Sequence, residues 1–155
     1  MQDNLLKDTF SSAKTIAMVG VSSVKKEIPS NIKRRPSIIV MKYMQDFGYR
    51  VIPVNPFSAG QEVNGETIIE NLEDIKMPVD IVDVFRPSEE IPPIAEQAVK
   101  INAKVLWLQY GIQNKIAEDV IKAAKIIYIA NKCIKQEYQR LFLKVSPVFP
   151  ALKNI

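Results

Sequence analysis

The sequence predicts an α/β protein with a three-layer, doubly wound (Rossmann-like) sheet that is mostly parallel and has about six strands. Short apolar runs rich in β-branched residues alternate with amphipathic segments along most of the chain, which is the pattern of consecutive βα units. Turn signals such as Asn-Pro, Arg-Pro and Tyr-Gly end several of the apolar runs, so that each run is bounded as a strand should be.

The predicted strands follow from these bounded apolar runs and cover residues 15–20, 50–54, 66–69, 80–85, 104–109 and 126–130. The predicted helices cover about residues 3–12, 36–47, 89–101, 114–124 and 134–143, with a helical turn at 70–75. Pro36 opens the second helix and Gly48 stops it, because proline is favoured in a first turn and glycine just after a last one. Pro92 and Pro93 are tolerated only in the first turn of their helix.

Length and composition indicate one soluble domain spanning residues 1–155, with a core over about 14–142 and a short C-terminal tail. The chain has 155 residues, 47% hydrophobic and 25% charged, a normal globular balance. No apolar run approaches the roughly 20 residues that cross a bilayer, and the N-terminus lacks the pattern of a signal peptide. A single cysteine fits a reducing cytoplasm, so we expect a cytoplasmic protein without a membrane partner.

The chain contains no histidine. This excludes Ser-His-Asp and Cys-His nucleophilic sites, phosphohistidine chemistry and imidazole metal sites. Carboxylate sites for Mg²⁺ or for acid–base chemistry are not excluded, but no spacing of the acidic residues singles one out. The composition therefore favours a binding protein over an enzyme.

The excess positive charge is concentrated between the first strand and the second helix. Residues 25–35 include five basic side chains and one acid, whereas the rest of the chain has 16 of each. Backbone N–H groups, a helix N-terminus and cations all favour an anion at such a loop. The individual lysines are equally well explained as a solvated surface run.

Ligands of open α/β sheets bind outside the carboxyl ends of the strands, near the switch in strand order. On topology alone the candidates are Gly20-Val21-Ser22, Asn55-Pro56, Phe85-Arg86, Gln109-Tyr110-Gly111 and Asn131-Lys132-Cys133.

A dinucleotide site is disfavoured by two missing features. The fingerprint G-x-G-x-x-G would need three glycines at the first turn, and only Gly20 is present. The second strand ends at Asn55-Pro56 without the acid that binds an NAD ribose or the cation that NADP requires. A P-loop motif is also missing.

Six segments, in order over about residues 14–142, resemble the small single-domain coenzyme A (CoA)-binding proteins, whose fold is similar to the CoA-binding domain of the succinyl-CoA synthetase alpha subunit. They are Ile16-Ala17-Met18-Val19-Gly20-Val21-Ser22, Arg35-Pro36-Ser37, 48–56, 78–86, 105–112 and Cys133-Ile134-Lys135-Gln136-Glu137. Two features depart from the family: residues 24–34 form a longer and more basic connection, and Asn131-Lys132 stands where Asp-Arg is more usual.

The resemblance implies a CoA site whose contacts are spread over four strand ends. The phosphates are expected near Gly20, Val21, Ser22, Lys25, Arg35, Pro36 and Ser37. Val54, Asn55 and Pro56 are expected to flank the adenosine, Phe85 and Arg86 to lie along the nucleotide, and Gln109 and Gly111 to lie near the pantetheine arm. Core packing for Phe85 and a simple turn at Asn55-Pro56 are the competing interpretations.

Two further residues carry separate expectations. Trp107 lies in the middle of a strand and is expected in the core. Cys133 is expected as a small buried hydrophobe, with a mixed disulfide to the CoA thiol as the alternative.

The leading hypothesis is therefore a non-catalytic module that binds CoA or an acyl-CoA as a carrier, sensor or accessory subunit. The alternatives are a subunit of an acyl-CoA-processing enzyme whose partner chain supplies the catalytic group, and an NAD(P)-binding regulatory protein. Nucleic-acid binding is not expected, because no stacking platform accompanies the charge. A homodimer and an enzyme partner chain both stay open.

Overall fold

A five-stranded parallel sheet forms the middle layer of the computed structural model, which describes residues 2–21 and 36–143. Its strands are β1 (Thr15–Val19), β2 (Arg50–Val54), β5 (Ile81–Val84), β6 (Val105–Leu108) and β7 (Ile127–Ile129). They lie in the order β2-β1-β5-β6-β7, so β1 and β5 are neighbours although β2 comes between them in the chain. The chain thus winds outward from β1 in both directions, which confirms the predicted fold class.

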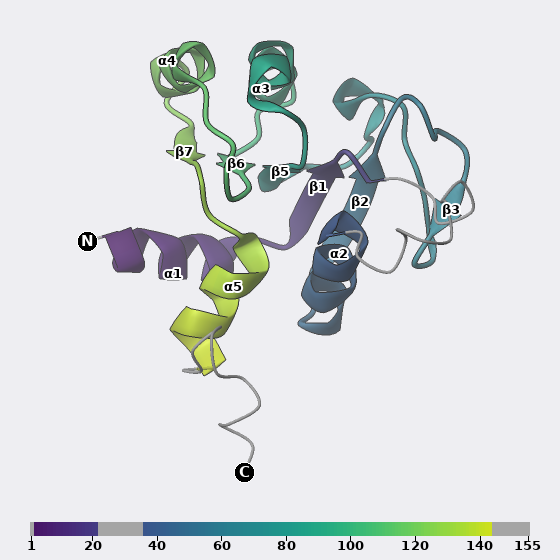
Figure 1. Cartoon of the computed structure of the whole chain (residues 1–155), viewed down its shortest axis with the longest axis horizontal. Coiled ribbons are helices and arrows are strands. Elements are labelled where there is room, and N and C mark those ends of the chain that lie inside the picture. The colour runs from purple at the N-terminus through teal and green to yellow at the C-terminus, as the bar shows by residue number, and fades with distance from the viewer. Residues whose placement is uncertain (1, 22–35, 144–155) are drawn as a thin grey trace.

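Helices cover both faces of this sheet (Figure 1). They are α1 (Gln2–Ser12), α2 (Pro36–Asp46), α3 (Ile91–Lys100), α4 (Lys115–Ala123) and α5 (Ile134–Tyr138). Within residues 2–21 and 36–143, three short helical segments accompany them: 3₁₀ turns η3 (Leu72–Asp74) and η4 (Ser88–Glu90), and a π-helical turn η5 (Gln139–Leu143). Helices α1, α2 and α5 pack on one face, and α3 and α4 pack on the other.

The alternation of side chains along each strand creates these two cores. In β1, Ile16 and Met18 are buried with α1, α2 and α5, whereas Ala17 and Val19 are buried with α3 and α4. Trp107 is fully buried, as predicted, and its indole N–H donates to the carbonyl of Lys132 at 2.8 Å. Because both faces are covered, the strands are apolar apart from Asp83 and from Thr15 and Arg50, which stand at the starts of β1 and β2.

The predicted third strand is shorter than expected, so the sheet has five strands where the sequence indicated about six. The strands β3 (Glu62–Val63) and β4 (Glu66–Thr67) form a separate antiparallel hairpin. Asn64 and Gly65 both have positive φ, 49° and 83°, which is the conformation that Asn-Gly hairpin turns require. After this hairpin only Ile69 reaches the sheet, in a parallel bridge to Val54 at the outer edge of β2. With this bridge counted as the third strand, the strand order is that of the Rossmann fold.

No helix within the part of the chain that the structure describes is long and apolar enough to cross a bilayer.

Candidate ligand-binding site

Two cavities open at the edge of the sheet where the parallel strands have their carboxyl ends. The first, here called the α3 pocket, has a volume of about 390 Å³ and lies between the ends of β1 and β2, η3 and α3. The second, here called the α5 pocket, has a volume of about 690 Å³ and lies beside the ends of β5 and β6 and the starts of α2 and α5. Arg86 lines both cavities, so it stands between them.

Gly20 brings the end of β1 against its neighbours. Its N–H donates to the carbonyl of Val54 at 2.8 Å, and its φ is +104°. A Cβ at this position would lie 2.8 Å from the backbone oxygen of Phe85 and 3.1 Å from Cδ of Arg86. Only glycine fits both this backbone conformation and this approach. The close packing places the turn after β1 directly beside Arg86.

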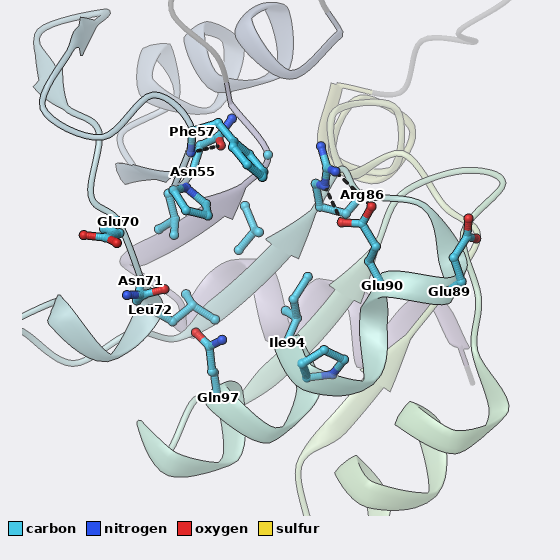
Figure 2. A pocket seen from close by; sticks show the side chains of 15 residues that line it. Asn55, Phe57, Glu70, Asn71, Leu72, Arg86, Glu89, Glu90, Ile94 and Gln97 are labelled. Carbon is cyan, nitrogen blue, oxygen red and sulfur yellow. Dashed lines mark hydrogen bonds and ion pairs between the residues drawn. The ribbon is translucent and has the colours of Figure 1, made fainter.

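Asn55 holds the turns after β1 and β2 together. Its side-chain amide donates to the carbonyl of Val21 at 3.0 Å, and its side-chain oxygen accepts from the N–H of Phe57 at 2.9 Å. Its own N–H donates to the carbonyl of Ile69 at 2.9 Å. The residue is buried and lines the α3 pocket (Figure 2). Asn55 is therefore both the turn residue and a pocket residue, so the two interpretations of Asn55-Pro56 are compatible.

Arg86 forms a two-pronged ion pair with Glu90 at the rim of the α3 pocket. Nε donates to Oε1 and Nη2 donates to Oε2, both at 2.9 Å. The hydrogen bonds and charge of Arg86 hold the pKa of the Glu90 carboxyl below its usual value. Figure 2 shows the two side chains facing each other, with Glu89 farther from Arg86.

The wall of the α5 pocket is mostly apolar. Phe85 lines it while also packing against the core beside α2 and α5, so the two interpretations of Phe85 are compatible. Gln109 is buried, and its side-chain oxygen accepts from the N–H of Ile134 at 3.2 Å, which ties the end of β6 to the start of α5. Cys133 is half-buried and lines the same cavity.

The predicted contact residues divide into three groups. Gly20, Val54, Asn55, Pro56 and Arg86 line the α3 pocket, and Pro36, Phe85, Arg86 and Gln109 line the α5 pocket. Val21, Ser37 and Gly111 line neither: Val21 is fully buried in the core, Ser37 is buried in the first turn of α2, and the exposed Gly111 donates its N–H to Asn131 at 2.6 Å. Ser22, Lys25 and Arg35 lie outside the described residues.

One whole wall of the α3 pocket was not predicted from the sequence. This wall comes from η3 and from the first turns of the helix after β5, and it consists of Glu70, Asn71, Leu72, Glu89, Glu90, Pro93, Ile94 and Gln97. Pocket residues that were likewise not predicted are, in the α5 pocket, Pro87, Ile112 and Gln136. The available signal was topological: the helical turn that follows a strand's carboxyl end lies at the same edge as the site.

One carboxyl group is buried near these cavities without a described partner. Asp83 on β5 is fully buried, and neither of its side-chain oxygens has a hydrogen-bond partner among residues 2–21 and 36–143. Burial raises its pKa well above the usual value. Its side chain lies on the same face of the sheet as Phe85, two residues closer to the middle of the strand. The same described residues hold no group of three or more Asp, Glu or Cys side chains able to bind a metal ion.

Comparison with known proteins agrees with this architecture. A family model described as a CoA binding domain matches residues 14–139. An uncharacterized protein of Bacillus subtilis (strain 168), YneT, is 38% identical over 130 residues, which are 84% of this chain and 89% of that protein. A structure from Thermus thermophilus, described as cell-free ID.343, is 39% identical with a TM-score of 0.81, and the match covers 92% of this chain and all of that one.

A more distant likeness concerns the fold alone. The structure of RSP in complex with β-NADH is 15% identical with a TM-score of 0.54, over 84% of this chain and 58% of that one. The match to the family model extends over most of the sheet and both cavities, and the two closer proteins span nearly the whole chain. The chain therefore belongs to the CoA-binding domain family.

Proposed function

We propose that this protein binds CoA, or an acyl-CoA, in an extended conformation across the two cavities. The observation that carries the proposal is the position of Arg86, which lies between the α3 pocket and the α5 pocket. CoA has a matching division into an adenosine end, a charged pyrophosphate and a long pantetheine arm. The adenosine would occupy the α3 pocket, and the arm would occupy the α5 pocket.

The chemistry of each cavity supports this orientation. The α3 pocket combines apolar side chains, Leu72 and Ile94 among them, with the amide of Gln97, a mixture that suits a base and its ribose. The α5 pocket combines Phe85 and Ile112 with the amides of Gln109 and Gln136, which suits an arm of methylene and amide groups.

The phosphates would lie between the cavities, over the Gly20 turn. Pro36 opens α2 and lines the α5 pocket, so the N-terminus of this helix is at the same edge of the sheet. A helix N-terminus favours an anion. The five basic residues of 25–35 come before α2 in the sequence.

We further propose a binding role without catalysis of its own, as a carrier, sensor or accessory subunit. The absence of histidine from the sequence supports this role. An enzymatic role would need a catalytic group on a partner chain.

A comparison of ligands by thermal shift tests the proposal. CoA at about 100 times its Kd should stabilise the protein by about 2.7 kcal/mol, which for a chain of this length raises Tm by roughly 5–10 °C. We expect a smaller shift with dephospho-CoA, because it lacks the ribose 3′-phosphate, and little shift with NAD. A shift with NAD but none with CoA would replace this proposal by the dinucleotide-binding alternative. Native mass spectrometry of freshly purified protein then distinguishes bound CoA from an acyl-CoA by mass.

A further inference from the structure

We propose that Glu90 competes with the ligand's diphosphate for Arg86, and that this built-in competition sets the affinity of the site and its selectivity for diphosphate ligands. The inference rests on the proposed function, because it concerns the place where the pyrophosphate would cross. In the free protein, Glu90 holds the guanidinium of Arg86; in the complex, the diphosphate takes its place.

The geometry makes the two interactions mutually exclusive at one edge of the guanidinium. Glu90 uses Nε and Nη2 of Arg86, one on each carboxylate oxygen, at 2.9 Å each. This edge of the guanidinium presents two parallel donors, which is also the arrangement that binds two phosphate oxygens. A phosphate that binds this edge must therefore displace the carboxylate.

Arg86 lies on the path that joins the two cavities. It lines both of them, and its Cδ is so close to Gly20 that a Cβ there would approach to 3.1 Å. A ligand that extends from the α3 pocket into the α5 pocket passes this point. The Arg86 side chain is 33% exposed and that of Glu90 is 45% exposed, so a ligand in solution can reach the pair.

The exchange is selective because the two competitors differ in charge. An exposed Arg–Glu pair is weak, and a diphosphate brings more negative charge than one carboxylate. Neutral groups such as adenosine or pantetheine have no anion with which to displace Glu90. After the exchange, the Glu90 carboxylate has lost its ion pair with Arg86 and lies near the negatively charged diphosphate. The free-energy cost of this change lowers the ligand affinity of the wild-type protein. Removing the carboxylate should therefore strengthen binding.

Calorimetric titration of the full chain with CoA and with ADP tests the competition. We expect Glu90→Gln to tighten binding of both ligands about fivefold, the size expected for loss of an exposed ion-pair competitor. Arg86→Gln should weaken binding of both. In the Arg86→Gln background the ion pair is already absent. Adding Glu90→Gln to this variant should therefore raise the affinity only by the small amount expected from a change of net charge.

Glu96→Gln is the matched control. Glu96 is an exposed carboxylate on α3 and lines neither cavity. Its replacement should change affinity less than twofold. Equal gains from Glu96→Gln and Glu90→Gln, or no gain from Glu90→Gln, would overturn the inference. Thermal unfolding of each variant without ligand confirms that the titrated protein is folded.

The two ligands separate this inference from the proposed function. If CoA does not bind while ADP binds with the Glu90-dependent gain, the proposed ligand is wrong and the role of Glu90 stands. If CoA binds equally well to wild type and Glu90→Gln, the proposed function stands and the competition is wrong. If neither ligand binds any variant, both fail.

Discussion

At the residue scale, the most unusual group is the carboxyl of Asp83. It lies in a parallel strand between Met18 of β1 and Trp107 of β6, in a row of otherwise apolar side chains. A charged carboxylate in such a place is strongly destabilised, and the pKa of Asp83 is accordingly raised well above its usual value by burial. The folded state therefore holds a proton that the unfolded state releases at a lower pH.

This difference predicts how stability depends on pH. Because the folded pKa of Asp83 is the higher one, its contribution to stability is complete below the unfolded pKa of about 3.8 and is lost as pH rises towards the folded pKa. Within that window the loss is about 1.4 kcal/mol per pH unit. We expect Asp83→Asn to abolish this loss, so that the variant gains stability over wild type with rising pH.

Denaturant unfolding from pH 5 to 8 measures the effect. Asp8→Asn, an exposed position on α1, is the control for a change of charge alone. Parallel pH profiles for wild type and Asp83→Asn would show that Asp83 is ionised in the folded protein.

At the element scale, hydrogen bonds from one side chain fix how the ends of β1 and β2 meet. Asn55 donates to the carbonyl of Val21 beyond β1 and accepts from Phe57 beyond β2. We expect Asn55→Ala to destabilise the fold by about 1–3 kcal/mol, since it leaves a buried carbonyl and a partly buried N–H without these partners. It should also weaken CoA binding, because the wall of the α3 pocket depends on both turns.

The variant Asn55→Asp separates the hydrogen bond that Asn55 donates from the one that it accepts. A carboxylate keeps the acceptor for the N–H of Phe57 but removes the donor to Val21. Its loss of stability should be at least as large as that of the alanine variant at neutral pH, because a buried charge is added. Urea unfolding and CoA titration measure both quantities, and unchanged values for Asn55→Ala would remove this residue from the site.

The same scale explains which elements the sequence could predict. The strands β1, β2, β5, β6 and β7 are mostly apolar runs, and their positions were predicted to within about one residue at each end. The region after β2 was not, because Asn64-Gly65 is a hairpin turn whose flanking strands are only two residues long. Periodicity needs a longer run than that to indicate a strand.

At the scale of the whole molecule, parallel connectivity explains why part of the lining of the candidate site was predictable. Gly20, Asn55 and Arg86 end different strands, and any parallel sheet brings such ends to one edge. Topology also places η4 and the start of α3 at this edge. That Glu90, Ile94 and Gln97 face the cavity was not predictable, because it depends on how these two segments are rotated over the sheet. The ion pair of Arg86 shows the same limit: its spacing of four residues is visible in the sequence, but its place between two cavities is not.

The distribution of charge gives the last prediction. Residues 25–35 carry the chain's entire net charge of +4, and in the sequence they stand between β1 and α2. If CoA binds at the carboxyl edge of the sheet, the field of these cations raises its affinity and makes the affinity fall with added salt. We expect the triple variant Lys25→Gln, Lys26→Gln, Lys33→Gln to bind CoA more weakly than wild type, by about tenfold at low salt, if each lysine contributes a few tenths of a kcal/mol as exposed charges do.

A second triple variant separates this local field from net charge alone. Lys14, Lys76 and Lys125 are exposed and precede β1, β5 and β7, at the opposite edge of the sheet. Their replacement by glutamine lowers the net charge by the same amount, but at more than a Debye length of about 10 Å in 0.1 M salt it should leave CoA affinity within about twofold of wild type. Titrations at 0.02 and 0.3 M NaCl should show a flattened salt dependence only for the 25–33 variant. Equal losses in the two triple variants would mean that CoA responds to the overall charge, and the basic segment would then have no special part in the site.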